Sequence, residues 1–154
     1  MSLINLGSYP GRDCPNVYFK PTVIDRILEA VALLMLLVVW VSVYLLYTWK
    51  GGILSHNVWI MGGMALFCTV LLGICSYAPV RNINFPVRVN ERNIGVQYLL
   101  AVRLIRILNV TLNLIFLSSI FGEYYKMARL FFYAGFGVLS LILIVYFVIA
   151  HKYK

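Results

Sequence analysis

Acidic side chains, and charged side chains in general, are scarce in this sequence. Asp and Glu together number 5, and charged residues make up 12% of the chain, where an ordinary soluble domain carries about 25%. The hydrophobic fraction is 62%, and the apolar residues stand in blocks. This composition excludes a soluble globular domain, a disordered chain and a nucleic-acid-binding domain. We expect the lipid bilayer to be the solvent of this protein.

Cysteine and histidine are also few, with 3 and 2 residues. Metal sites need three or four converging ligands, and His56 and His151 fall at opposite ends of the expected spans. Cys68 and Cys75 lie about two helical turns apart, which is about 10 Å and too far for a disulfide within one helix. The serines have no evident His or Asp companion. We therefore expect no catalytic residue, no metal and no cofactor, and we do not expect an enzyme.

Four apolar stretches are long enough to cross a hydrocarbon core, which takes about 20 helical residues. The clearest, 30–49, contains no charge, whereas the third has only the charge-free run 107–122 and must extend back past Arg103 and Arg106. Continuous apolar runs exclude the alternating strands of a membrane β-barrel. The sequence predicts an all-α polytopic membrane protein with four transmembrane helices in a bundle. The expected spans are about 23–49, 57–79, 97–122 and 128–150, with an N-terminal tail over 1–21 and a loop over 80–96, in a single membrane domain, 1–154.

The first span has a recognisable start. Thr22 and Asp25 form a T-x-x-D pattern, in which the threonine oxygen caps early amide groups and the carboxylate lies at the positive end of the helix dipole. We expect the first helix to begin directly after Thr22.

Basic residues are distributed unequally between the two sides of the expected bundle. Cytoplasmic segments of membrane proteins carry an excess of Lys and Arg, so the side with more basic residues indicates the cytoplasm. One side has Arg12, Lys20, Arg26, Arg81, Arg88, Arg92, Arg103, Arg106, Lys152 and Lys154, and the other has Lys50, Lys126 and Arg129. Both termini and the loop 80–96 are therefore expected to be cytoplasmic, and the net charge of +8 needs no nucleic-acid partner.

Polar residues on two of the spans suggest a specific contact. Asp25 and Glu29 stand at i and i+4 on one face of the first span. The third span carries Arg103, Arg106, Asn109 and Asn113 on one face at 100° per residue. Charges within a membrane are usually paired, so we expect these six residues to form an interhelical polar clasp between the first and third spans. The alternative is that the charges lie at headgroup depth and are solvated.

Three segments resemble a known family. They are 21–29 (PTVIDRILE), 84–93 (NFPVRVNERN) and 97–108, which contains Gln97-Tyr98 followed by the A-x-R-x-x-R pattern ending at Arg106. Together they resemble bacterial membrane proteins with the domain of unknown function numbered 1648, over roughly residues 20–121. The family usually has a P-x-H-F…G-x-P loop between its first two spans. Here the corresponding segment, 50–57 (KGGILSHN), lacks it.

The resemblance implies a small multi-pass protein of the bacterial cytoplasmic (inner) membrane. The best-understood relatives include a membrane immunity protein against a secreted peptide toxin. By analogy, this chain is expected to bind a partner in the bilayer: another membrane protein, a second copy of itself or a peptide toxin. Two alternatives stay open, a structural subunit or small-solute transporter of a membrane complex, and a four-helix membrane transferase. The transferases that act on eicosanoids and glutathione have a charged second helix, which 57–79 does not match.

Overall fold

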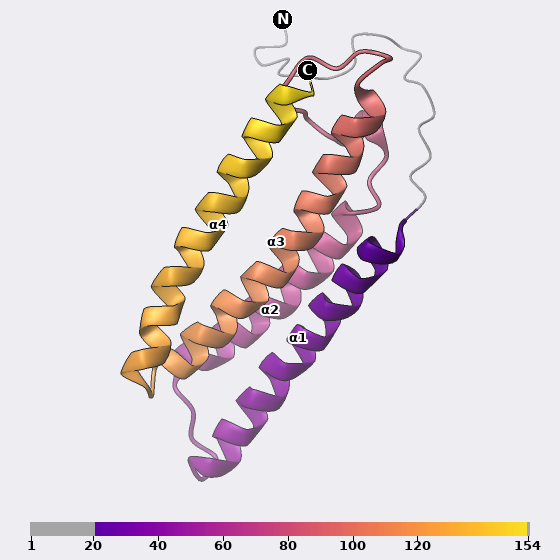
Figure 1. Cartoon of the computed structure of the whole chain (residues 1–154). Helices are drawn as coiled ribbons and strands as arrows, with labels where there is room; N and C mark the ends of the chain where they lie inside the picture. Colours follow the sequence, from indigo (N-terminus) through magenta and orange to yellow (C-terminus); the bar gives the residue numbers. More distant parts are fainter. Residues whose placement is uncertain (1–20, 154) are drawn as a thin grey trace, which may run out of the picture.

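The fold is built from helices alone over the part of the chain that can be described. The structure is a computed structural model that describes residues 21–153. The expected N-terminal tail, apart from Pro21, and the terminal Lys154 lie outside these residues. Within them the elements are α1 (Val23–Trp49), α2 (His56–Cys75), the short 3-10 helix η1 (Val80–Asn82), α3 (Ile94–Gly122) and α4 (Lys126–Lys152). Figure 1 shows the four long helices running side by side.

All four long helices are long and apolar enough to cross a membrane. They contain 27, 20, 29 and 27 residues, against the roughly 20 that a hydrocarbon core requires. Successive helices run in opposite directions, so the start of α1, the segment between α2 and α3, and the end of α4 lie at the same end of the bundle (Figure 1). These are the features of a multi-pass membrane protein.

Both ends of α1 are defined by local sequence. The expected start is confirmed, because Thr22 is the N-cap and forms a capping box with Asp25. At the other end, Gly51 and Gly52 have φ values of 67° and 88°, and their amide groups donate to the carbonyls of Thr48 and Tyr47. This is the Schellman arrangement, in which glycine adopts the left-handed conformation at low energy.

Two helix boundaries differ by three residues or more from those expected, and the others agree within two residues. The second span was expected to reach residue 79, but α2 ends at Cys75. Pro79 keeps the helix from reaching that residue, because proline disfavours helical backbone at the residue before it. The α-helical pattern stops earlier still, since the amides of Tyr77 and Ala78 donate to the carbonyls three residues before them. The third span was expected to begin at residue 97, but α3 begins at Ile94. Asn90 and Asn93 form a side-chain-stabilised turn there, in which Asn90 Oδ1 accepts from the Asn93 amide at 3.0 Å, and the helix starts directly after it.

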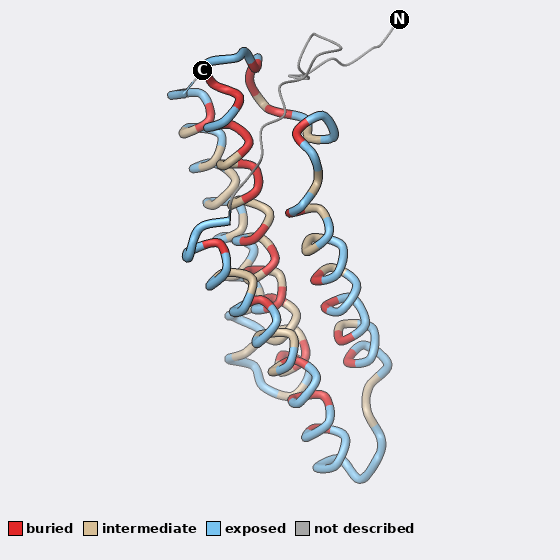
Figure 2. The backbone as a smooth tube through the Cα atoms, turned by 90° about the vertical axis from the view of Figure 1, so that its right-hand side faces the viewer, coloured by how far each residue is buried: buried red, intermediate tan, exposed pale blue. Residues whose placement is uncertain are grey.

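The third helix lies at the centre of the bundle. α3 packs against α1, α2 and α4, whereas α4 packs mainly along α3. In Figure 2 the buried positions lie toward the interior and the outward-facing turns are exposed. One apolar cluster joins α1, α2 and the end of α3, and includes Val43, Val58 and Ile120. A second lies at the other end, where Phe85 and Val89 of the loop cover the first turns of α3.

Candidate functional site: buried polar contacts among the helices

The first buried polar group is Asp25, whose side chain is 0% exposed. Its Oδ2 accepts hydrogen bonds from the Thr22 amide (2.9 Å) and the Thr22 hydroxyl (2.6 Å). Its Oδ1 lies 3.1 Å from Arg106 Nη1. The capping box of α1 thus holds the carboxylate in the position where it meets the α3 arginine, so helix capping and helix pairing use the same side chain.

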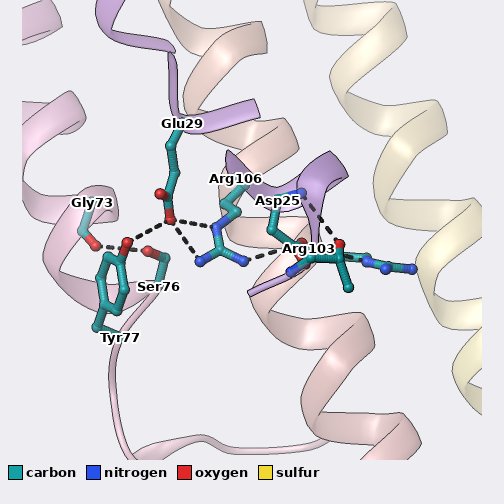
Figure 3. Close-up of polar contacts among 8 residues, drawn as sticks. Asp25, Glu29, Gly73, Ser76, Tyr77, Arg103 and Arg106 are labelled. Atoms are coloured by element: carbon teal, nitrogen blue, oxygen red, sulfur yellow. Dashed lines mark hydrogen bonds and ion pairs between the residues drawn. The ribbon is translucent and has the colours of Figure 1, made fainter. Parts of the chain in front are cut away.

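Arg106 connects two carboxylates of α1. Its side chain is 2% exposed. Besides the contact with Asp25, its Nε donates to Glu29 Oε1 at 2.8 Å and its Nη2 lies 2.6 Å from the same oxygen. The i, i+4 spacing of Asp25 and Glu29 places both carboxylates on one face of α1, and the planar guanidinium reaches both (Figure 3). We call Asp25, Glu29, Arg103 and Arg106 the ion-pair cluster.

Arg103 is the outermost member of the ion-pair cluster. Its Nε lies 3.5 Å from Asp25 Oδ1, and its side chain is 33% exposed. In Figure 3 its guanidinium group extends away from Arg106. Arg103 therefore helps to neutralise the Asp25 carboxylate, but it lies farther from that carboxylate than Arg106 does.

The amide residues expected in the polar clasp contact a different helix from the one expected. We expected Asn109 and Asn113 to extend the contact between α1 and α3. Instead, Asn113 Nδ2 donates to the Thr69 hydroxyl at 2.8 Å, and Asn109 Nδ2 donates to the Thr69 carbonyl at 3.3 Å. Thr69 belongs to α2. Arg106 and Asn113 lie about two helical turns apart on one face of α3, and this face meets α1 at Arg106 and α2 at Asn113. We call Asn109, Asn113 and Thr69 the amide cluster.

Tyr77 borders the ion-pair cluster, although nothing in the sequence indicated this contact beyond an aromatic residue near the expected membrane surface. Its hydroxyl donates to Glu29 Oε1 at 2.8 Å, and the Arg106 guanidinium lies 5.7 Å from its ring centroid. The hydrogen bond to Glu29, followed by burial, raises the pKa of the Tyr77 phenol above its ordinary value of 10.0. Tyr77 therefore stays protonated and keeps donating to Glu29 at neutral pH.

Two more polar side chains of α3 were missed by sequence reasoning. Gln97 is fully buried and its Nε2 donates to the carbonyl of Ala150 at 2.9 Å, where α4 nears its end. Tyr98 donates its hydroxyl to the carbonyl of Ala78 at 2.9 Å. Both satisfy carbonyl groups that helix ends and turns leave unpaired. In the sequence they stood out only as the Gln97-Tyr98 pair of the family resemblance, which did not indicate these contacts.

The histidine, cysteine and carboxylate side chains of the described residues do not gather into a metal site. Within residues 21–153, no group of three or more such side chains could hold a metal ion. His56 begins α2, and His151 lies in the last turn of α4. The arrangement that the structure does offer is electrostatic, with two carboxylates and two guanidinium groups at one end of the bundle.

Comparison of the chain with protein-family models, with curated proteins and with solved structures found no match. The resemblance described above rests on its three sequence segments. Two of those segments supply the residues of the ion-pair cluster, since Asp25 and Glu29 lie in 21–29 and both arginines lie in 97–108.

Proposed function

We propose that this chain is a multi-pass protein of the bacterial cytoplasmic membrane that acts by binding a partner within the bilayer. Its termini and the loop between α2 and α3 lie in the cytoplasm. Following the resemblance, its role is that of an immunity or accessory protein whose partner is a peptide toxin or another membrane protein.

The observation that carries this proposal is the unequal burial of the helices. Of all the residues in α4, only Ala150 is buried, whereas α1 and α3 each bury residues along most of their length. Large apolar side chains stand outward along α4, among them Phe136 (47% exposed), Ile144 (59%) and Phe147 (50%). These three lie within an arc of about 80° at 100° per residue. Such a face can pack against a partner helix without rearrangement of the bundle.

The polar residues support binding over the transporter alternative. That alternative requires the face from Arg103 to Asn113 to line a solute path. Arg106, Asn109 and Asn113 are instead buried between helices, and each contacts a neighbouring helix through an ion pair or hydrogen bond. Their arrangement favours a structural role inside the bundle and leaves the apolar outer surface for a partner.

The orientation can be tested with reporters. A topology reporter inserted at Gly52 is expected on the non-cytoplasmic side, and one fused after Lys154 is expected in the cytoplasm, because most Lys and Arg residues flank the latter side. A cytoplasmic location for the Gly52 reporter would contradict the proposed orientation.

Partner binding can be tested in the host by deleting the gene and exposing the cells to peptides secreted by the parent strain. We expect the deletion strain to become sensitive and the intact gene to restore protection. A gene with Phe136, Ile144 and Phe147 changed to alanine is expected to give the same protein level without protection. The matched control changes Leu33, Leu37 and Tyr44, three exposed residues on one face of α1, and is expected to protect. Equal growth of the deletion strain and its parent would refute the immunity role.

A further inference from the structure

A groove between α3 and α4 combines an apolar surface with one arginine. It encloses about 300 Å³, at the lower end of the range of about 300–1,000 Å³ for small-molecule sites. Apart from Arg103 and Tyr146, its walls are aliphatic side chains, which lie between Leu100 and Ile107 on α3 and between Leu141 and Ile149 on α4. From this groove we infer a binding site for one anionic glycerophospholipid, with an acyl chain in the groove and the phosphate at Arg103.

The groove has the direction that an acyl chain requires. On α3 its walls run from Leu100 to Ile107, and on α4 they run from Ile149 back to Leu141. At 1.5 Å per residue these segments are about 10 and 12 Å long, and they lie along the helix axes. A lipid chain, which also runs roughly along the membrane normal, can therefore lie in the groove over this distance.

Arg103 lies at the depth of the lipid phosphates. α3 contains 29 residues and is therefore about 43 Å long, whereas the hydrocarbon core is about 30 Å thick. When the Gly122 end is placed at one boundary of the core, the other boundary falls about 20 residues earlier, near Val102. Leu104 and Ile107 then lie in the hydrocarbon, and the Arg103 guanidinium lies where phosphate groups begin. The inference thus depends on membrane insertion, but not on the proposed partner.

The charges around Arg103 favour an anionic lipid. Asp25 is bound more closely by Arg106 (3.1 Å) than by Arg103 (3.5 Å), and the Arg103 side chain is 33% exposed. Further basic residues stand exposed at the same end of the bundle: Arg26, Arg81, Arg88, Arg92 and Lys152. Each basic residue near a membrane surface attracts anionic lipid by about 1 kcal/mol. A zwitterionic lipid offers the same phosphate, but its ammonium group is repelled by these residues.

Native mass spectrometry of the full chain in detergent tests this site, with phosphatidylglycerol and phosphatidylcholine as probes. We expect one phosphatidylglycerol to be retained, with about fivefold weaker retention of phosphatidylcholine. Arg103→Gln should reduce this preference, because the other exposed basic residues at this end of the bundle remain. Val145→Trp fills the groove and should weaken retention of both lipids. The matched control Val148→Trp changes a valine on the same helix that is 64% exposed and does not line the groove, and it should bind as the unmodified chain does.

Three results would overturn the inference. The first is equal retention of the two lipids by the unmodified chain, as surrounding annular lipid alone would give. The second is unchanged retention in Val145→Trp, which keeps Arg103 and decides the question even where Arg103→Gln fails to fold. The third is a dimer that carries no lipid, because a second copy of the chain would then fill the groove.

Discussion

α3 and α4 are similar in length, and both are apolar enough to cross a membrane, yet they relate to the rest of the molecule in opposite ways. α3 contacts all three other long helices and carries Gln97, Arg106, Asn109 and Asn113 as buried polar residues. α4 packs mainly along α3 and buries Ala150 alone. Apolar surface does not distinguish a neighbouring helix from lipid, because lipid tails are equally apolar. Polar side chains and close packing, rather than hydrophobicity, therefore determine which helix lies at the centre of this bundle.

The largest loss of stability is expected from removing Arg106, the arginine through which α3 holds α1. In Arg106→Leu, Asp25 stays fully buried, and only the more distant Arg103 remains to neutralise its negative charge. Breaking a buried ion pair by deleting one partner costs about 3–5 kcal/mol. We expect a strong loss of folded protein, measured by unfolding in mixed micelles. The control Arg26→Leu makes the same change at an exposed position of α1 and should shift stability by less than about 0.5 kcal/mol. Equal effects of the two changes would show that Arg106 has no special role.

A smaller effect is expected where α4 meets α3. A Cβ atom at Gly135 would lie 2.6 Å from Ile115 Cγ1, whereas one at Gly137 would meet nothing within 4 Å. Gly135→Ala should therefore push the two helices apart and destabilise the protein by about 1–3 kcal/mol. Gly137→Ala should be neutral or stabilise by up to about 1 kcal/mol, because alanine favours the helix. The same unfolding measurement compares them, and a harmless Gly135→Ala would mean that the helices do not approach so closely.

The amide cluster tests whether neutral polar contacts hold helices as strongly as ion pairs do. Asn113→Leu removes the hydrogen bond to Thr69 in α2. Hydrogen bonds between membrane helices contribute about 0.6 kcal/mol on average and at most about 1.7, so the loss should be well below that of Arg106→Leu. A loss as large as that of Arg106→Leu would show that the amide cluster holds the helices as strongly as the ion-pair cluster does.

The smallest effect is expected from the phenol that borders the ion-pair cluster. Tyr77→Phe removes one of the donors to Glu29 Oε1 and leaves the two from Arg106, so the loss should be below about 1 kcal/mol. The pKa of Tyr77 is raised in the folded protein. Its contribution is therefore fully present below the ordinary value of 10.0 and declines as the pH rises through the raised value. Unfolding of the unmodified chain and of Tyr77→Phe, measured from pH 8 to about pH 11, should converge at the alkaline end, and parallel curves would contradict this.

Much of the fold follows from the sequence, because span length and charge-free runs are set by the thickness of the hydrocarbon core. The number of helices and the capping box at Thr22 could be read directly. The early end of α2 was not predicted, although Pro79 indicates that a helix stops before it. The i, i+4 spacing of Asp25 and Glu29 and the face shared by Arg103 and Arg106 were also visible.

The pairing of particular helices was less predictable. A polar face indicates that a contact exists, but it does not indicate which helix covers it. For this reason, Asn109 and Asn113 were expected to face α1 and instead face α2. The contacts of Tyr77 and Gln97 could not be predicted, because their partners, Glu29 and the carbonyl of Ala150, lie 48 and 53 residues away in the sequence. Residues so far apart in the chain come together only when the helices pack.

The central claim is that direct contact between Arg106 and the α1 carboxylates holds the bundle together, and a double-mutant cycle tests it most directly. A charge swap is unsuitable, because Arg106 also lies 3.1 Å from Asp25, which would face a new carboxylate. The cycle therefore uses Glu29→Gln, Arg106→Met and both together, with the free energy of unfolding measured for each. We expect the two changes to be non-additive by about 1 kcal/mol or more, with the double variant less destabilised than the sum of the singles. Additive losses would contradict the claim.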